Sequence, residues 1–145
     1  MRILAFDTAT EACSAAMLVD NELVSRFEIA PRRHAELILP MIEEVMTQAE
    51  LKLSQLDAIA MGCGPGSFTG VRIATGVAQG IAFAADLPVI PISTLAAMAL
   101  DITQTHNNEH FTYIAVAIDA RMHEVYWGLY RADPEFGVEA LDTDC

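Results

Sequence analysis

The residues most able to carry chemistry lie in a glycine-rich loop at positions 62–72. The loop reads Gly-Cys-Gly-Pro-Gly-Ser-Phe-Thr-Gly-Val-Arg. Its glycines permit positive φ angles and close approach of another group, and Ser67 and Thr69 are residue types that cap a helix start. It is not a P-loop, because no Lys-Ser or Lys-Thr pair follows the last glycine, and it lacks the G-x-G-x-x-G spacing of dinucleotide sites. The loop therefore indicates either a phosphate or partner contact, or an ordinary strand-to-helix turn.

The histidines and the loop cysteine are the other candidates for reactive or metal-binding groups. His106 and His110 have H-x-x-x-H spacing, but their polar, Asn-rich surroundings favour a loop over a helix that would aim both imidazoles at one point. His34 and His123 are expected to be surface or interface residues. No basic residue lies near Cys63 in the sequence, so we expect a packed thiol and not a nucleophile. The sequence predicts no metal site and no catalytic residue.

Composition restricts the class of protein and of partner. The 145 residues are 53% hydrophobic, which exceeds the usual share for a soluble protein and suggests a protein–protein interface. No apolar run has the roughly 20 residues of a membrane span. A formal charge of −12 makes direct binding to nucleic acid unfavourable. Three cysteines without C-x-x-C spacing, and no signal peptide pattern at the N-terminus, are typical of a reducing cytoplasm.

The first half of the sequence predicts a three-stranded meander followed by a helix. A short apolar run, Ile3–Phe6, reads as a buried central strand that ends at Asp7-Thr8. Strands are predicted at Cys13–Val19 and Leu23–Ile29, and helical periodicity covers Arg33–Glu50.

Within that helix, the predicted core stripe is Ile38, Ile42, Val45 and Ala49. Leu37 and Met41 lie off this stripe, so they indicate either a second apolar patch that contacts a partner or a broad core face.

The next segment alternates strands and helices. Strands are predicted at Asp57–Met61 and Val89–Ile92, with an apolar helix at Thr69–Ala85 between them and another helix beginning at Thr94. The Thr69–Ala85 helix is apolar almost all round, so it should be covered on both sides. Gly76 and Gly80, four residues apart on this helix, would let a helix approach closely, whether from another chain or from the same domain.

A second unit is expected to begin after the polar segment around residue 105. Tyr113–Ile118 is an apolar strand ended by Asp119, and Glu124–Tyr130 can form its antiparallel partner. Beyond residue 132 the chain is acidic and predicts no element. We therefore expect an N-terminal lobe at 1–110 and an incomplete second lobe with an acidic tail at 111–145.

Three sequence blocks in this order resemble the signatures of the bacterial TsaB (YeaZ) family. They are D-T-A-T-E-A-C-S-A-A at Asp7–Ala16, G-P-G-S-F-T-G-V-R-I at Gly64–Ile73 and D-A-R-M-H-E-V-Y-W at Asp119–Trp127. The similarity covers Arg2 to about Tyr130. It implies an α/β fold: the N-terminal lobe of an actin-like ATPase (ribonuclease H-like), with a mixed sheet flanked by helices, plus the start of a truncated second lobe. Family members are longer, so the chain is expected to be a fragment.

The resemblance implies a non-catalytic scaffold or activator in the synthesis of threonylcarbamoyladenosine on tRNA. Its implied partners are a TsaD-type catalytic subunit, a TsaE-type ATPase and, when alone, a second copy of itself; no membrane and no direct nucleic-acid partner is expected. The helix after Pro31 and the helix after the glycine loop would form one shared surface. Within it, the expected interface residues are Leu37, Met41, Gly70, Val71, Arg72, Thr75, Gly76, Gln79 and Gly80.

The alternative is an enzyme acting alone, either an ATPase or phosphotransferase or a protease. Related catalytic subunits carry a metal-binding H-x-x-x-H where this chain has Thr94 and Met98, and neither can replace imidazole on a metal. No cofactor is expected, although ATP or ADP at a complex interface is left open. The resemblance implies a vestigial nucleotide site at Asp7, Thr8, Gly64, Gly66 and Asp119.

Overall fold

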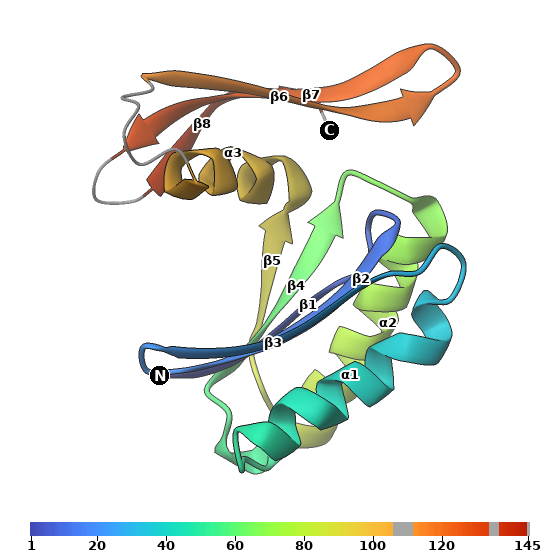
Figure 1. Ribbon diagram of the computed structural model, residues 1–145, viewed down its shortest axis with the longest axis vertical. Coiled ribbons are helices and arrows are strands. Elements are labelled where there is room, and N and C mark those ends of the chain that lie inside the picture. Colours follow the sequence, from blue (N-terminus) through green and yellow to red (C-terminus); the bar gives the residue numbers. More distant parts are fainter. Residues whose placement is uncertain (106–111, 134–136, 145) are drawn as a thin grey trace. The chain divides into compact units, whose positions relative to one another are not determined.

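The computed structural model describes residues 1–105, 112–133 and 137–144. The chain forms two compact units, one made of residues 1–63 and 67–92 and the other of residues 64–66 and 93–145 (Figure 1). This division comes earlier in the chain than the expected boundary at residue 110, because the helix that begins at Thr94 packs within the second unit.

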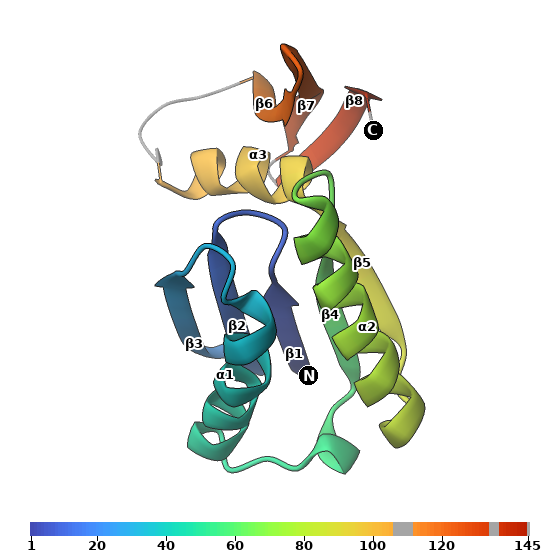
Figure 2. The same cartoon turned by 90° about the vertical axis from the view of Figure 1, so that its right-hand side faces the viewer.

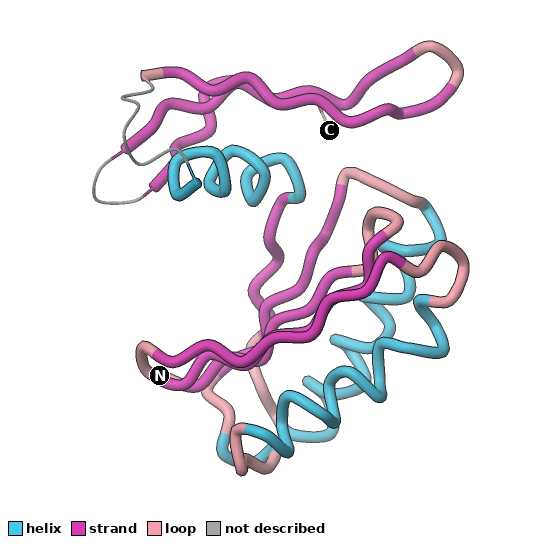
Figure 3. The backbone as a smooth tube through the Cα atoms, in the orientation of Figure 1, coloured by secondary structure: helices cyan, strands magenta, loops and turns pink. Residues whose placement is uncertain are grey.

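The first unit is a five-stranded mixed sheet with two helices. Its spatial order is β3-β2-β1-β4-β5, in which β1 pairs antiparallel with β2 and parallel with β4 (Figure 3). The predicted meander is therefore confirmed, and so is the central position of the first strand. The strands are β1 (Arg2–Asp7), β2 (Ala12–Val19), β3 (Glu22–Ile29), β4 (Ala58–Gly64) and β5 (Val89–Ser93).

Both helices of this unit pack on the same face of the sheet. They are α1 (His34–Gln48) and α2 (Phe68–Ala85), and a short 3-10 turn at Leu53–Gln55 follows α1 (Figure 2). Alternate residues of the central strands point to this face, since side chains along a strand have a period of two. Leu4 and Met17 are fully buried there, and α1 contributes Ile38 and Val45 to the same core.

Three apolar residues of strand β3 lie on its exposed face and not on the face toward the helices. Leu23, Phe27 and Ile29 are 67%, 68% and 67% exposed. The face toward α1 instead carries Arg26, whose Nε donates to Glu44 at 2.9 Å, and Glu28, which pairs with Arg33 at 3.1 Å. Ion pairs therefore tie this edge strand to the helix, together with Val24, which packs against the core.

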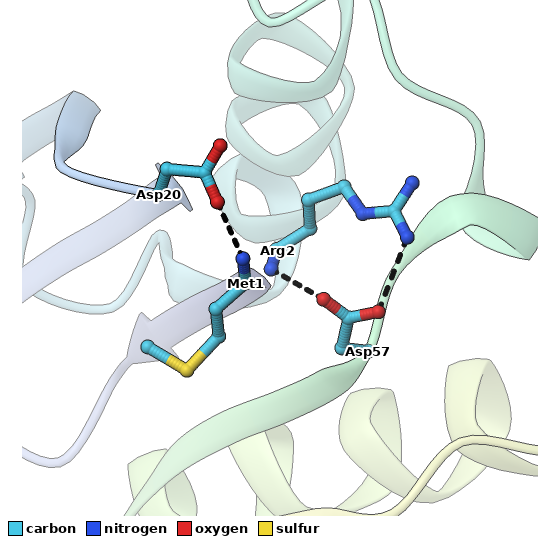
Figure 4. A network of polar contacts seen from close by, with 4 residues as sticks. All are labelled: Met1, Arg2, Asp20 and Asp57. Carbon is cyan, nitrogen blue, oxygen red and sulfur yellow. Dashed lines mark hydrogen bonds and ion pairs between the residues drawn. The ribbon is translucent and has the colours of Figure 1, made fainter.

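The N-terminus is held by a small polar network (Figure 4). The terminal ammonium of Met1 lies 2.6 Å from Asp20, which lowers the pKa of that carboxyl. The backbone N–H of Arg2 donates to Asp57 at 2.7 Å and its guanidinium lies 3.2 Å from the same carboxylate, and these bonds lower the pKa of Asp57. These contacts fix the start of β1 against the β2–β3 turn and the start of β4.

The second unit packs one helix on a three-stranded antiparallel sheet. The elements are α3 (Thr94–Thr105), β6 (Tyr113–Arg121), β7 (Glu124–Asp133) and β8 (Gly137–Asp144), with β7 in the middle. Leu95 and Ala99 of α3 pack against Ile114, Val116 and Tyr130. The prediction of an acidic tail without structure is wrong, because residues 137–144 pair with β7 along their length.

No helix in the described part of the chain is long and apolar enough to span a membrane.

Candidate protein-interaction surface and nucleotide site

The glycine loop leads into α2 through a side-chain cap. Ser67 is the residue before the helix, and its Oγ accepts the backbone N–H of Gly70 at 3.3 Å. The capping role expected for Ser67 is therefore confirmed, whereas Phe68 and Thr69 are already inside the helix.

The start of α2 is fastened to the end of β1. The Thr8 hydroxyl donates to the carbonyl of Gly70 at 2.6 Å, and the N–H of Ser67 donates to the carbonyl of Ala9 at 2.6 Å. A Cβ on Gly70 would overlap the carbonyl oxygen of Thr8, so this glycine is required by close backbone approach. Gly70 is buried within the chain, and its predicted place in a partner interface is wrong.

The outward side of α2 carries a continuous stripe of exposed or half-exposed residues. Its members recur at intervals of three or four, which places them on one side of the helix. Both ends of the stripe are aromatic, with Phe68 73% and Phe83 93% exposed. We call this set the α2 stripe: Phe68, Arg72, Thr75, Gly76, Gln79, Gly80 and Phe83.

Two features make the centre of the α2 stripe flat and uncharged. A Cβ built on Gly76 or Gly80 meets nothing within 4 Å, so neither glycine is explained by packing inside the chain. The Arg72 guanidinium lies 3.3 Å from the centroid of the Phe68 ring, which draws the helix's one charged side chain toward its N-terminal end. The expectation that α2 is covered on both sides is not met by the described residues of its own unit.

On α1 the contacts of Arg26 distinguish the flank that faces β3 from the flank near α2. Arg26 of β3 reaches Glu44 and Gln48, so these two residues mark the flank facing β3. Leu37 and Met41, at heptad spacing from them, share this side of the helix. Met41 is only 7% exposed and Leu37 packs against the core. The alternative that these two residues belong to a broad core face is therefore correct.

The exposed apolar residue of α1 is Leu39, which the sequence reasoning missed. It is 55% exposed, and helical geometry places it on the flank of α1 away from Glu44 and Gln48, and so away from β3. Helix α2 runs along that side of α1 (Figure 2). Glu43, one turn later, lies near it and lines a shallow groove on the outer side of α1. The groove is lined by Arg26, Pro40, Glu43, Glu44, Thr47 and Gln48.

Asp7, a residue of the expected nucleotide site, has a raised pKa in the folded chain. Burial raises the pKa of its carboxyl, while the backbone N–H of Ala9, which donates at 2.8 Å, and the charge of His34 lower it. A Cβ on Gly62 would overlap the carboxylate, so Asp7 lies directly over that glycine. Among the described residues, no hydrogen bond or ion pair brings an Arg or Lys side chain to this carboxylate.

These surroundings do not fit the phosphates of a nucleotide. Thr8 is completely buried, and its hydroxyl is committed to Gly70. An anion beside Asp7 would meet a half-buried carboxylate to which no described Lys or Arg side chain is bonded. The other expected residues, Gly64, Gly66 and Asp119, belong to the second unit.

The remaining candidates for chemistry have the following positions. His34 is 8% exposed, so the prediction of a surface histidine is wrong for it, and its Nε2 has no hydrogen-bond partner. Cys63 is exposed, so the prediction of a packed thiol is wrong. His106 and His110 lie outside the described residues. No group of three or more potential metal ligands occurs in the described part of the chain.

Thr94 and Met98 both lie on α3. Thr94 is buried at its N-terminal end and Met98 is 39% exposed. The helix starts where the sequence predicts, and the Ser93 hydroxyl accepts the N–H of Ala96 at 3.4 Å.

Comparison with known proteins gives consistent matches. The family model "TsaD: tRNA N6-adenosine threonylcarbamoyltransferase" matches residues 22–143. Two relatives are named "tRNA threonylcarbamoyladenosine biosynthesis protein TsaB". That of Haemophilus influenzae is 54% identical over 88% of this chain and 52% of its own length. That of Escherichia coli is 50% identical over 92% and 56%. The chain thus spans about half the length of these relatives.

A solved structure described as YeaZ from Pseudomonas aeruginosa superposes with a TM-score of 0.92 at 44% identity. The match covers 99% of this chain and 66% of that one.

Proposed function

Because this chain belongs to the TsaB (YeaZ) family and has its actin-like fold, we propose that it serves tRNA threonylcarbamoyladenosine biosynthesis as a non-catalytic scaffold. In this role it binds a TsaD-type catalytic subunit through the α2 stripe and the neighbouring flank of α1. A second copy would use the same surface when the partner is absent. A role on tRNA, and three cysteines without C-x-x-C spacing, fit a protein of the reducing cytoplasm.

One observation carries the proposal: the α2 stripe is open, has an exposed Phe ring at each end, and has two central glycines that packing among the described residues does not explain. Phe68 and Phe83 leave aromatic area in water, and two glycines in the middle of a helix lower its stability relative to alanine. Both features suit a surface that another helix covers, since small residues let helix axes approach closely. The buried side of α2 holds Ala74 and Ala78 and already accounts for its packing on the sheet.

The residues of the α2 stripe complement one another when two copies of the helix run antiparallel, as a twofold interface requires. If two α2 helices pack antiparallel about an axis between Thr75 and Gly76, then Phe68 lies opposite Phe83 of the second copy. Arg72 then lies opposite Gln79, and Thr75 opposite Gly76. Each aromatic ring meets a ring, and the centre stays narrow enough for close packing.

The test is a substitution at the centre of the α2 stripe. Thr75 is half-exposed, so Thr75→Arg should leave the fold intact while placing a charge in the interface. We expect self-association and binding to a TsaD-type subunit to weaken by at least about tenfold, measured by size-exclusion chromatography with light scattering. The matched control is Ser25→Arg, at an exposed position of β3 on the face of the sheet opposite the two helices. Retained binding by Thr75→Arg, with native circular dichroism, would show that the interface lies elsewhere.

The competing function is an ATPase or phosphotransferase that uses Asp7 and Asp119, or a protease. The closed contact between Thr8 and Gly70 speaks against the nucleotide-dependent version. An enzyme of that kind requires saturable nucleotide binding that Asp7→Ala abolishes. The scaffold requires that Asp7→Ala leave partner binding nearly unchanged. Participation of a TsaE-type ATPase in the same assembly is part of the proposal and is tested by adding it to the purified pair.

A further inference from the structure

The charges around the α2 stripe are strongly one-sided. Helix α1 contains Glu36, Glu43 and Glu44 and no Lys or Arg. Glu44 is paired with Arg26, and Glu36 lies 3.6 Å from Arg33. Glu43 takes part in no ion pair among the described residues. The outer side of α1 therefore carries at least one carboxylate outside any ion pair, one helical turn from the exposed Leu39.

The α2 side does not balance this charge. Its one charged residue is Arg72, and the guanidinium of that residue stacks on the chain's own Phe68. Glu43 and Glu44 both line the groove on the outer side of α1. Arg26 of β3 also lines it and is already paired with Glu44. A basic side chain entering this groove would find an unpaired carboxylate, whereas an acidic one would be repelled.

We propose that the carboxylates of α1, Glu43 above all, select the occupant of the α2 stripe: they favour a protein with a basic counter-surface over a second copy of this chain. The inference rests on the proposed function and adds the chemistry of the partner and its dependence on ionic strength. Two identical chains bring like charges to one interface, and each carries a formal charge of −12. A basic partner instead gains from the same carboxylates.

This predicts opposite salt dependences for the two complexes. Added salt screens exposed charges, with a screening length of about 10 Å at about 0.1 M and about 3 Å at about 1 M. Raising NaCl from about 0.05 M to about 0.5 M should tighten self-association, on the order of fivefold, and loosen the complex with the TsaD-type subunit by a similar factor. Analytical ultracentrifugation of the whole chain, alone and with that subunit, measures both constants.

Charge variants assign the effect to α1. Glu43→Gln should tighten self-association at low salt and flatten its salt dependence, and Glu43→Lys should do so more strongly while weakening the heterocomplex. The control Glu22→Gln makes the same change of charge at the exposed start of β3. It should have a clearly smaller effect, because its carboxylate lies at the edge of the sheet and not on α1.

The outcomes separate this inference from the function on which it rests. If Thr75→Arg abolishes association but self-association is insensitive to salt, or weakens with it, the surface is right and the charge selection is overturned. Equal effects of Glu22→Gln and Glu43→Gln would overturn the assignment to α1, since only net charge would then matter. A chain that remains monomeric at about 0.5 M NaCl would also overturn the proposed charge selection. If Thr75→Arg leaves association intact, the proposed interface itself fails.

Discussion

At the scale of single residues, two glycines of the first unit differ in whether the structure has room for a side chain. A Cβ on Gly62 would overlap the carboxylate of Asp7, whereas a Cβ on Gly76 meets open space. We expect Gly62→Ala to lower the free energy of unfolding by about 1–3 kcal/mol, because the side chain of Asp7 must move. Gly76→Ala should raise it by about 0.5–1 kcal/mol, because alanine is the better helix former.

Urea denaturation followed by far-UV circular dichroism measures both glycine variants, at protein concentrations where the chain is monomeric. If both substitutions changed the unfolding midpoint in the same direction, the difference in their surroundings would not be what governs them.

Asp7 offers a second test at this scale, through pH. Burial raises the pKa of its carboxyl in the folded chain, so ionisation is less favourable folded than unfolded. The stability contributed by this group is then complete below its unfolded pKa of about 4 and is lost as pH rises through the folded pKa. Asp7→Asn retains an oxygen that can accept the N–H of Ala9 but cannot ionise.

Asp7→Asn should therefore be more stable than the parent chain at about pH 7 and lose that advantage at about pH 3. Chemical denaturation at a series of pH values gives the difference, from which groups common to both chains cancel. A difference independent of pH would mean that the carboxylate is not destabilised by burial.

At the scale of elements, periodicity in the sequence was enough to locate the strands and helices of the first unit. What it could not supply was which side of an element meets which neighbour. On α1 the pattern identified Ile38 and Ile42, yet only the structure shows that Met41 is buried in the core and that Leu39 is exposed on the flank away from the Arg26–Glu44 ion pair. Phe68 and Phe83 share helical spacing with the predicted interface residues of α2, and that spacing was the signal available for finding them. Leu39 lies two residues from both Leu37 and Met41, so spacing from the predicted residues did not indicate it.

Two other elements departed from expectation for long-range reasons. The strand β8 has an acidic composition that resembles a tail, and it forms because its backbone pairs with β7. Gly70 fits the pattern of an interface glycine, but its close contact is with Thr8, a residue 62 positions earlier in the chain. Neither contact leaves a local trace in the sequence.

The proposed antiparallel pairing of α2 makes an element-scale prediction. In a Cys63→Ser background, Thr75→Cys places a thiol beside the twofold axis, where it meets its counterpart. Oxidation should then give a cross-linked dimer on a non-reducing gel. Ala84→Cys is the matched control, because Ala84 is exposed on the same helix but would lie opposite position 67 of the second copy, far from its own counterpart. Cross-linking of Ala84→Cys in preference to Thr75→Cys would mean that the helices meet on another side.

At the scale of the whole molecule, charge decides which partners the chain can bind without help. The formal charge of −12 is distributed unevenly, since residues 93–145 hold nine acidic and two basic side chains. In the first unit, Arg2, Arg26 and Arg33 are engaged in ion pairs, and Arg72 stacks on Phe68. A phosphate backbone would therefore meet mainly carboxylates.

The chain alone should accordingly show no saturable binding to unmodified tRNA at about 0.15 M salt, because affinity for nucleic acid depends on Lys and Arg side chains that release counterions from phosphates. Filter binding measures this, and the mixture with the TsaD-type subunit provides the comparison in which retention on the filter is expected. Binding by the chain alone that falls steeply with salt would contradict the prediction. It would require a cationic surface, and Arg72→Ala would then test whether the α2 stripe contacts RNA instead of protein.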